Sequence, residues 1–239
     1  MYRDIAEIRQ FYHSPLGVLT AKTLTRTLES VWPDFLTNDA NCVGVGYATP
    51  YLDETAPHLA VMSATQGVVR WPSKGPNKTV LTADHVLPFA DNALDRLLFV
   101  HAIENADYLR ELMSDAWRVL APNGRMMIIV PNRRGLWSRV DKTPFGHGRP
   151  YTMKQMRNLL REANFVVENH TRALYFFPSH STILRMLAPF MEKAGRKIMP
   201  KFGGVILIEA SKKLYNVTAI PVAQATQPGK AWNAEPLPT

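Results

Sequence analysis

The sequence has little of what marks membrane-spanning, disulfide-bonded or zinc-binding proteins. Cys42 is its one cysteine, so no internal disulfide can form, and a lone thiol suits a reducing cytosol. The longest apolar runs, 126–130 and 205–208, are far shorter than the roughly 20 residues that cross a bilayer. The seven histidines show no metal-ligand spacing. We therefore expect neither a transmembrane helix nor a bound metal.

The first ten residues, MYRDIAEIRQ, mix acids with bases and lack the apolar core of a signal peptide, so we expect a cytoplasmic protein. The net charge of +8 predicts attraction to anions, which include nucleic acid, an acidic membrane surface and a charged small substrate. Charge alone does not choose among them. With 46% hydrophobic residues, 239 residues are enough for one full α/β domain.

Strand and helix patterns alternate along the chain. This alternation predicts βαβ units, and hence a doubly wound, mostly parallel sheet with helices on both faces. Leu24, Leu28 and Val31 recur at helical spacing after a Ser14-Pro15 start, and the apolar residues of the run 95–102 are continuous rather than alternating, as in a buried parallel strand. The predicted helices are 15–31, one starting at Thr49 or Pro50, one with its apolar stripe at 109–120, and 156–163; the predicted strands are 41–45, 58–63, 79–84, 95–102, 125–130, 165–177 and 203–215.

The predicted organisation is one domain over 1–216. Within it, 1–38 forms an N-terminal helical segment and 131–152 forms a lid-like loop. Beyond it, 217–239 is rich in Pro, Ala and Gln, a composition typical of a flexible tail.

The stretch NCVGVGYATPYL combines an apolar strand with two closely spaced glycines, Gly44 and Gly46. In an open α/β sheet, ligands bind at the carboxyl ends of the strands, and the loop after the first strand is the usual place. Glycines there permit a tight turn and a close approach of the backbone to a ligand. A glycine turn that only packs helix on strand is the structural alternative.

Four features in order resemble the class I S-adenosylmethionine-dependent methyltransferases. They are VGVGYA after the first strand, Ala83-Asp84 after the third, LPFADNALD (87–95) before the fourth, and WRVLAPNGRMMIIVPN (117–132) around the fifth. The resemblance covers roughly residues 11–215. It implies a seven-stranded, Rossmann-like sheet with an antiparallel last strand, and S-adenosyl-L-methionine as cofactor.

Carried over by position, the family pattern implies a cofactor site. It places Gly44, Val45 and Gly46 beneath the methionyl and ribose part. Asp84 would face the adenine amino group, His85 would cap the ring, and Val100 and His101 would floor the pocket. The full implied set is Gly44, Val45, Gly46, Tyr47, Met62, Ser63, Ala83, Asp84, His85, Val100 and His101.

Two departures from the family pattern concern charge. Cys42 stands where the family usually has an acid before the glycines, and the second strand ends in Met62-Ser63 without the acid that grips the ribose hydroxyls. The loop also has Ala48 in place of a third glycine. A lost charge-assisted hydrogen bond costs roughly 1.5 to 3 kcal/mol. These departures motivate an alternative: a degenerate methyltransferase fold that binds or regulates without turnover.

The lid-like loop is rich in cations and aromatic residues, which suggests a small acceptor with an anionic or aromatic part. A solvated basic loop is the alternative for each residue alone, and its two glycines around His147 suggest a tight turn. The candidate substrate-binding residues are Tyr12, Arg133, Trp137, His147, Arg149 and Tyr151. Methyl transfer relies mostly on positioning, so we assign no catalytic residue.

Three further readings are weighed against a small-molecule methyltransferase. The chain reads His101-Ala-Ile-Glu104 where amino-methylating nucleic-acid enzymes carry Asn/Asp-Pro-Pro-Tyr/Phe, which argues against a nucleic-acid acceptor. A dehydrogenase is disfavoured because GxGxxG is missing.

The basic amphipathic stretch 181–201 could contact an anionic membrane peripherally, cover a core or form a homodimer contact.

Overall fold

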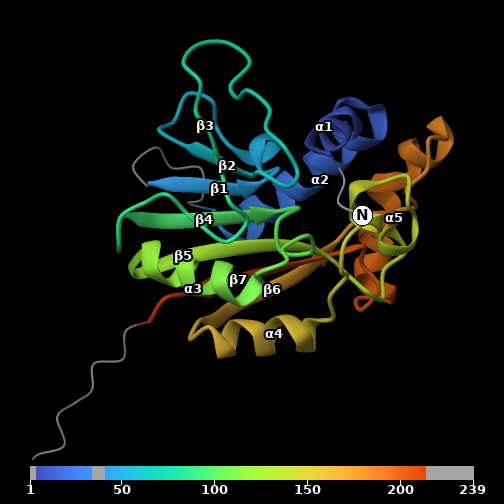
Figure 1. Cartoon of the computed structure of the whole chain (residues 1–239). Coiled ribbons are helices and arrows are strands. Elements are labelled where there is room, and N and C mark those ends of the chain that lie inside the picture. The colour runs from blue at the N-terminus through green and yellow to red at the C-terminus, as the bar shows by residue number, and fades with distance from the viewer. Residues whose placement is uncertain (1–3, 34–40, 214–239) are drawn as a thin grey trace, which may run out of the picture.

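A computed structural model describes residues 4–33 and 41–213, and a single seven-stranded sheet organises it (Figure 1). The strand order is β3-β2-β1-β4-β5-β7-β6. β7 is antiparallel to both of its neighbours, and the other paired strands run parallel, which confirms the predicted sheet. The strands are β1 (Cys42–Gly46), β2 (Leu59–Ser63), β3 (Thr79–Thr82), β4 (Leu94–Val100), β5 (Leu120–Pro131), β6 (Val166–Ala173) and β7 (Val205–Ser211).

Helices cover both faces of this sheet, as the alternating pattern predicted. They are α1 (Ile5–His13), α2 (Pro15–Val31), α3 (Leu109–Val119), α4 (Met153–Glu162) and α5 (Thr182–Ile198). One core joins α1 and α2 to side chains such as Leu98 and Val100, and the other joins α3 and α4 to Leu97 and Phe99. Because successive strand residues point to opposite faces, one buried strand feeds both cores.

Capping residues set the boundary between the N-terminal helices α1 and α2. Ser14 ends α1, and its hydroxyl accepts a hydrogen bond from Gly17 N at 3.1 Å to begin α2. Pro15 occupies the first turn, where no backbone N–H is needed. The helix predicted at 15–31 is therefore confirmed, while α1 is an additional helix within the predicted helical segment.

The helix predicted to start at Thr49 or Pro50 is wrong. Only a single 3-10 turn, η1 (Thr49–Tyr51), follows β1. Asp53 then accepts hydrogen bonds from the backbone N–H and hydroxyl of Thr55 at 2.8 and 2.7 Å, a local pairing that competes with helix formation. The connection to β2 is thus an irregular loop, and it is too short for the usual crossover helix.

Element boundaries also differ from the sequence prediction. β5 begins at Leu120, five residues before the predicted strand, because Leu120 pairs with Leu94 across an irregular step in the β4–β5 ladder. β3 ends at Thr82, which leaves Ala83 and Asp84 in the loop beyond it. The predicted tail at 217–239 lies outside the described residues.

The strand order reverses at β1, which pairs with β2 on one side and β4 on the other. At this point the connections leave toward opposite faces, so a crevice opens outside the carboxyl ends of the strands. Gly46 ends β1 with φ of 80°, and a Cβ there would stand 2.3 Å from the Val100 carbonyl oxygen. Only glycine permits this approach between β1 and β4.

We expect Gly46→Ala to destabilise the fold more than Gly75→Ala. Both glycines have positive φ, but an added Cβ at Gly75 meets nothing within 4 Å. Backbone strain alone costs about 1 kcal/mol, and the overlap at Gly46 brings the total to about 3 kcal/mol. Thermal melts should fall by about 2–4 °C for Gly75→Ala and by about 6–12 °C for Gly46→Ala. Equal losses would contradict the close approach.

Cys42 should be chemically inert in the folded protein. Burial raises the pKa of its thiol to about 12, despite the nearby Arg96 guanidinium, which lowers it. The thiolate is the reactive form, so at pH 8 the native protein should resist alkylation by iodoacetamide. Denaturant should restore full reactivity, as mass spectrometry would show. Rapid labelling of the native protein would show that β1 opens readily.

Candidate functional site

A narrow hollow of about 20 Å³ lies at the carboxyl ends of β1, β2, β3 and β4. Its walls come from the ends of these strands, from the loops after β2, β3 and β4, and from α3. Its floor includes Gly46, whose missing side chain leaves the strand end open. The lining residues are Val45, Gly46, Val61, Ser63, Thr65, Gln66, Thr82, Ala83, Asp84, Val86, Leu87, Ala102, Asn105, Ala106 and Leu112.

One carboxylate anchors the polar side of this hollow. Ser63, the last residue of β2, donates its hydroxyl to Asp84 Oδ1. The Thr65 hydroxyl lies 3.0 and 2.9 Å from the two Asp84 oxygens. A carboxylate offers about four acceptor positions, so these two hydroxyls orient Asp84 and leave capacity for a further donor.

Two buried amide side chains in the lining carry polar atoms without a partner. They are the Gln66 Nε2 donor and the Asn105 Oδ1 acceptor. Asn105 is held in place because its Nδ2 donates to the His101 carbonyl oxygen at 3.0 Å. An unsatisfied buried polar group costs about 1–3 kcal/mol, which a polar ligand that reached these atoms would recover.

An aromatic cluster adjoins the hollow on the far side of Gly46. Tyr47 follows Gly46, donates its N–H to the Val100 carbonyl oxygen at 2.8 Å, and stacks on Tyr12 of α1 with ring centroids 5.4 Å apart. Tyr51 and Phe145 also belong to this cluster. None of these four rings lines the hollow, so the hollow ends at Gly46.

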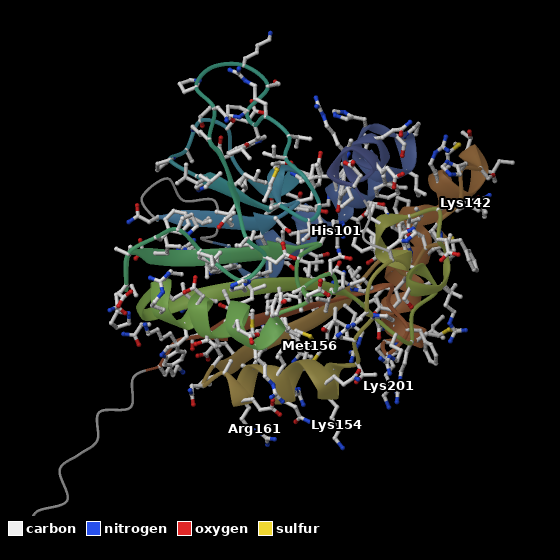
Figure 2. All side chains as sticks on the ribbon, viewed as in Figure 1. His101, Lys142, Lys154, Met156, Arg161 and Lys201 are labelled. Carbon is white, nitrogen blue, oxygen red and sulfur yellow. The ribbon has the colours of Figure 1, made fainter. Side chains whose placement is uncertain are left out.

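A buried hydrogen-bond chain runs through the cluster, with His101 at its centre (Figure 2). The Tyr12 hydroxyl lies 2.9 Å from the Tyr51 hydroxyl and 3.0 Å from His101 Nε2. On the other side of the ring, His101 Nδ1 lies 3.2 Å from Glu104 Oε1. If His101 Nδ1–H donates to Glu104, then Nε2 accepts from Tyr12, and every bond in the chain is satisfied.

The environment of this chain keeps its phenols protonated. Burial raises the pKa of Tyr12 well above its ordinary value, and Tyr51 and Glu104 raise it further. Burial likewise raises the pKa of Tyr51. His101 has φ of 55°, an uncommon conformation for a residue with a side chain. Glu104 Oε2 is buried without a partner. Strain and an unpaired carboxylate oxygen together are typical of functional sites.

The lid-like loop docks on the same segment. Arg149 N donates to the Glu104 carbonyl oxygen at 2.8 Å, and Gly148 packs so closely there that a Cβ would stand 2.6 Å from that oxygen. The Tyr151 hydroxyl lies 3.5 Å from the Ile103 carbonyl oxygen. The loop therefore covers the residues that follow β4.

The residues implied as cofactor contacts separate into two groups. Val45, Gly46, Ser63, Ala83 and Asp84 line the hollow together. The others do not: Gly44 packs beneath Ala48 and Leu52, Met62 and Val100 are buried in the core beneath α1 and α2, His85 packs on Tyr108, and Tyr47 and His101 belong to the aromatic cluster.

The six candidate substrate residues are dispersed rather than gathered. Tyr12 lies in the aromatic cluster, and Tyr151 is half-buried beneath the lid-like loop. Trp137 is fully buried, and its indole N–H donates to the Phe176 carbonyl oxygen at 2.8 Å. His147 Nε2 pairs with the Asp141 carbonyl oxygen at 2.7 Å. Arg133 and Arg149 are exposed on the loop surface.

Sequence reasoning missed Thr65, Gln66, Glu104 and Asn105. Two signals could have found them. Thr65 and Gln66 follow the end of β2, and Glu104 and Asn105 follow the end of β4, so both pairs stand at the edge of a parallel sheet where ligands bind. Among the described residues, no group of three or more His, Cys, Asp or Glu side chains could hold a metal ion.

We expect Tyr12→Phe to destabilise the protein by about 2 kcal/mol, because it leaves the Tyr51 hydroxyl and His101 Nε2 without a shared partner. Tyr175→Phe is the matched control, since its hydroxyl makes one exposed bond to the Pro200 carbonyl oxygen. That change should cost no more than about 0.5 kcal/mol. Chemical denaturation measures both. Similar losses would show that the buried chain contributes nothing special.

Comparison with solved structures places this fold among methyltransferases. A SAM-dependent methyltransferase from Thermotoga maritima, described as a possible histamine N-methyltransferase, matches with a TM-score of 0.60 and 15% identity over 87% of this chain and 96% of its own. A SAM-dependent methyltransferase from Archaeoglobus fulgidus matches at 0.54 and 18% over 79% and 93%. A Haloferax volcanii methyltransferase, solved with the activator Trm112, matches at 0.55 and 12% over 84% and 99%.

The comparison with curated proteins finds no match. Residues 40–128 match the family described as Methyltransferase domain, a span that runs from β1 through most of β5 and includes every lining residue of the hollow. The family match, the strand order and the placement of the hollow agree. Residues 40–128 therefore carry the pattern of a methyltransferase domain, and the chain has the fold of S-adenosylmethionine-dependent methyltransferases.

Proposed function

We propose that this protein transfers the methyl group of S-adenosyl-L-methionine to a small-molecule acceptor. The observation that carries the proposal is the hollow at the ends of β1 to β4, with an oriented carboxylate and two unpartnered amide atoms in its lining. The methyltransferase family match supplies the reaction class, and the acceptor class rests on the lid-like loop.

The lining fits the nucleoside part of the cofactor. An adenine edge presents an exocyclic amine, which donates, beside a ring nitrogen, which accepts. Asn105 Oδ1 and Gln66 Nε2 are the complementary acceptor and donor. Apolar side chains such as Val86 and Leu112 can pack against the purine faces.

Asp84 supplies the carboxylate that the end of β2 lacks. Ser63 is the last residue of β2, and its hydroxyl is hydrogen-bonded to Asp84. This bond brings the Asp84 carboxylate, from the loop after β3, to the place where the family has its ribose-binding acid. Ribose hydroxyls donate well to an ionised carboxylate. In this proposal Asp84 holds the ribose, and Asn105 takes the adenine amine that the sequence had assigned to Asp84.

The chemistry asks little of the protein beyond alignment. S-adenosyl-L-methionine supplies a methyl group on a sulfonium, whose departure leaves a neutral thioether. Residues of this chain would align the acceptor and exclude water, and the aromatic faces of Tyr12 and Tyr47 attract a cationic centre. For an acceptor that must lose a proton, His101 is the proton-accepting group, and Glu104 is the residue that positions it.

The acceptor inferred from the lid-like loop is small and carries an anionic or aromatic part. Arg133 and Arg149 are exposed cations on this loop, and Tyr151 lies between it and the segment after β4. A nucleic-acid acceptor is disfavoured by the sequence after β4. A cytosolic site of action is the inference that fits a single free thiol.

One observation favours a second candidate, a methyltransferase fold that binds or regulates without turnover. Tyr12, Tyr51 and His101 are packed and fully hydrogen-bonded beyond Gly46, where the methionyl part of the cofactor would extend. Turnover therefore requires α1, which carries Tyr12, to move when the cofactor binds. A binding protein would need no such movement.

Calorimetry with S-adenosyl-L-homocysteine tests the proposal. We expect Asp84→Asn to weaken binding by roughly ten- to a hundredfold, because a charge-assisted bond is worth roughly 1.5 to 3 kcal/mol. Glu162→Gln is the matched control: it removes the same charge from the exposed end of α4 and should leave the affinity within about twofold. No binding of either cofactor form near millimolar would overturn the proposal.

Release of S-adenosyl-L-homocysteine from S-adenosyl-L-methionine then separates the two candidates. Turnover with any acceptor in a panel of small anionic and aromatic compounds supports the enzyme. Two results together support the binding protein instead. One is tight cofactor binding without turnover across that panel, and the other is amide hydrogen exchange in α1, which carries Tyr12, that does not change when the cofactor binds.

A further inference from the structure

Helix α5 and its flanks expose an unusual amount of apolar surface. Ile183, Met186 and Phe190 are 71%, 77% and 72% exposed, whereas Ala188 alone in the helix is buried. Of the fourteen large hydrophobic side chains that are exposed in the described part of the chain, eight lie between residues 177 and 202. They are Phe177, Ile183, Met186, Leu187, Phe190, Ile198, Met199 and Phe202.

Cations border this apolar surface. Arg185, Lys193, Arg196, Lys197 and Lys201 fall within the same segment, against one acid, Glu192. That acid faces inward: its carboxylate accepts from the backbone N–H groups of Leu174 and Tyr175 at 3.2 and 2.7 Å. The charge that faces outward is therefore positive. On the helix surface, Lys193 lies three residues after Phe190, and Lys197 lies three residues after Ala194, so each lysine is a neighbour of an apolar residue.

A cleft beside α5 adds further cations from α2. Lys22 and Arg26 line it from α2, and Lys193, Arg196 and Glu192 line it from α5, where Glu192 Oε1 lies 3.6 Å from the Arg196 guanidinium. The cleft thus places positive side chains from two helices next to the exposed apolar residues. An anionic headgroup in the cleft would leave its acyl chains beside Phe190 and Met186.

We propose that α5 docks this protein on an anionic lipid bilayer. The helix would lie in the plane of the headgroups, with Met186 and Phe190 among the acyl chains and with Lys193 and Lys197, further along the same face, reaching the headgroups. No helix among the described residues is long and apolar enough to cross a membrane. A protein interface of the same apolar area would be depleted in lysine at its core, so the pattern of charge favours lipid.

The docking surface is joined to the lid-like loop. Asn132, at the base of that loop, donates its Nδ2 to the Lys201 and Gly203 carbonyl oxygens at 3.1 and 2.6 Å. Figure 2 shows Lys142 of the loop and Lys201 on the same side of the molecule as α5. Docking would therefore bring the loop close to the bilayer. The proposal does not depend on the proposed methyl transfer.

Vesicle flotation of the full chain tests the proposal. We expect binding to vesicles of equal parts phosphatidylcholine and phosphatidylserine, and at least about tenfold less binding to phosphatidylcholine alone, because each cation near an anionic surface adds roughly fivefold. Met186→Ser with Phe190→Ser should reduce binding by at least about tenfold without lowering the melting temperature, since both side chains are exposed. Lys193→Glu with Lys197→Glu should do the same.

The matched control reverses two cations elsewhere. Lys154→Glu with Arg161→Glu makes the same change of charge on α4, where Figure 2 shows both side chains pointing away from the sheet. It should alter vesicle binding by no more than about threefold. Three results would overturn the proposal: no binding to anionic vesicles, equal losses in the α4 and α5 charge variants, or a dimer in light scattering that Met186→Ser with Phe190→Ser dissociates.

Discussion

The close approach of Gly46 to the carbonyl oxygen of Val100 is the contact on which the site depends. It brings the ends of β1 and β4 together without a side chain between them, and the N–H of Tyr47 then binds that same oxygen. Beyond this junction, the segments that follow β1 and β4 run in different directions. Ala102 and Asn105 continue from β4 into the wall of the hollow, while Tyr47 turns toward α1. A larger residue at position 46 would separate the strands and disrupt the hollow and the aromatic cluster at once.

The two sides of this junction have opposite chemical character. On one side, the hollow has a largely apolar lining, and some of its hydrogen-bonding capacity is unused at Gln66 and Asn105. On the other, Tyr51, Tyr12, His101 and Glu104 form a closed chain that is almost fully paired. The first side has room for about one water molecule, so a nucleoside enters only if the side chains that line it move, whereas the second side opens only if α1 moves. Binding and turnover therefore make different demands on the same fold, because satisfied buried hydrogen bonds must be broken before the second side can open.

The surface of α5 and the candidate site would bind their ligands through different interactions. Buried carboxylates and amides select a ligand by geometry, whereas the exposed apolar and basic residues of α5 act through area and charge. A hydrogen bond from the Asn132 side-chain amide to the Lys201 carbonyl oxygen joins the lid-like loop to the segment that follows α5. This arrangement keeps the lid-like loop near whatever surface α5 contacts, which would shorten the path of an acceptor that arrives from that surface.

The sequence by itself determined the order and type of all seven strands and of helices α2, α3 and α4, because the periodicity of apolar residues is local: Leu24 and Leu28 share a helix face, and 95–102 reads as a buried strand whatever surrounds it. It also located Gly46 and Asp84 at strand ends. Only the tertiary structure decided that Asp84 turns toward Ser63, that Trp137 joins the core, and that Tyr12 meets His101. These outcomes depend on partners that lie far apart in the chain, and hydrogen bonds between distant side chains leave no periodic trace in the sequence.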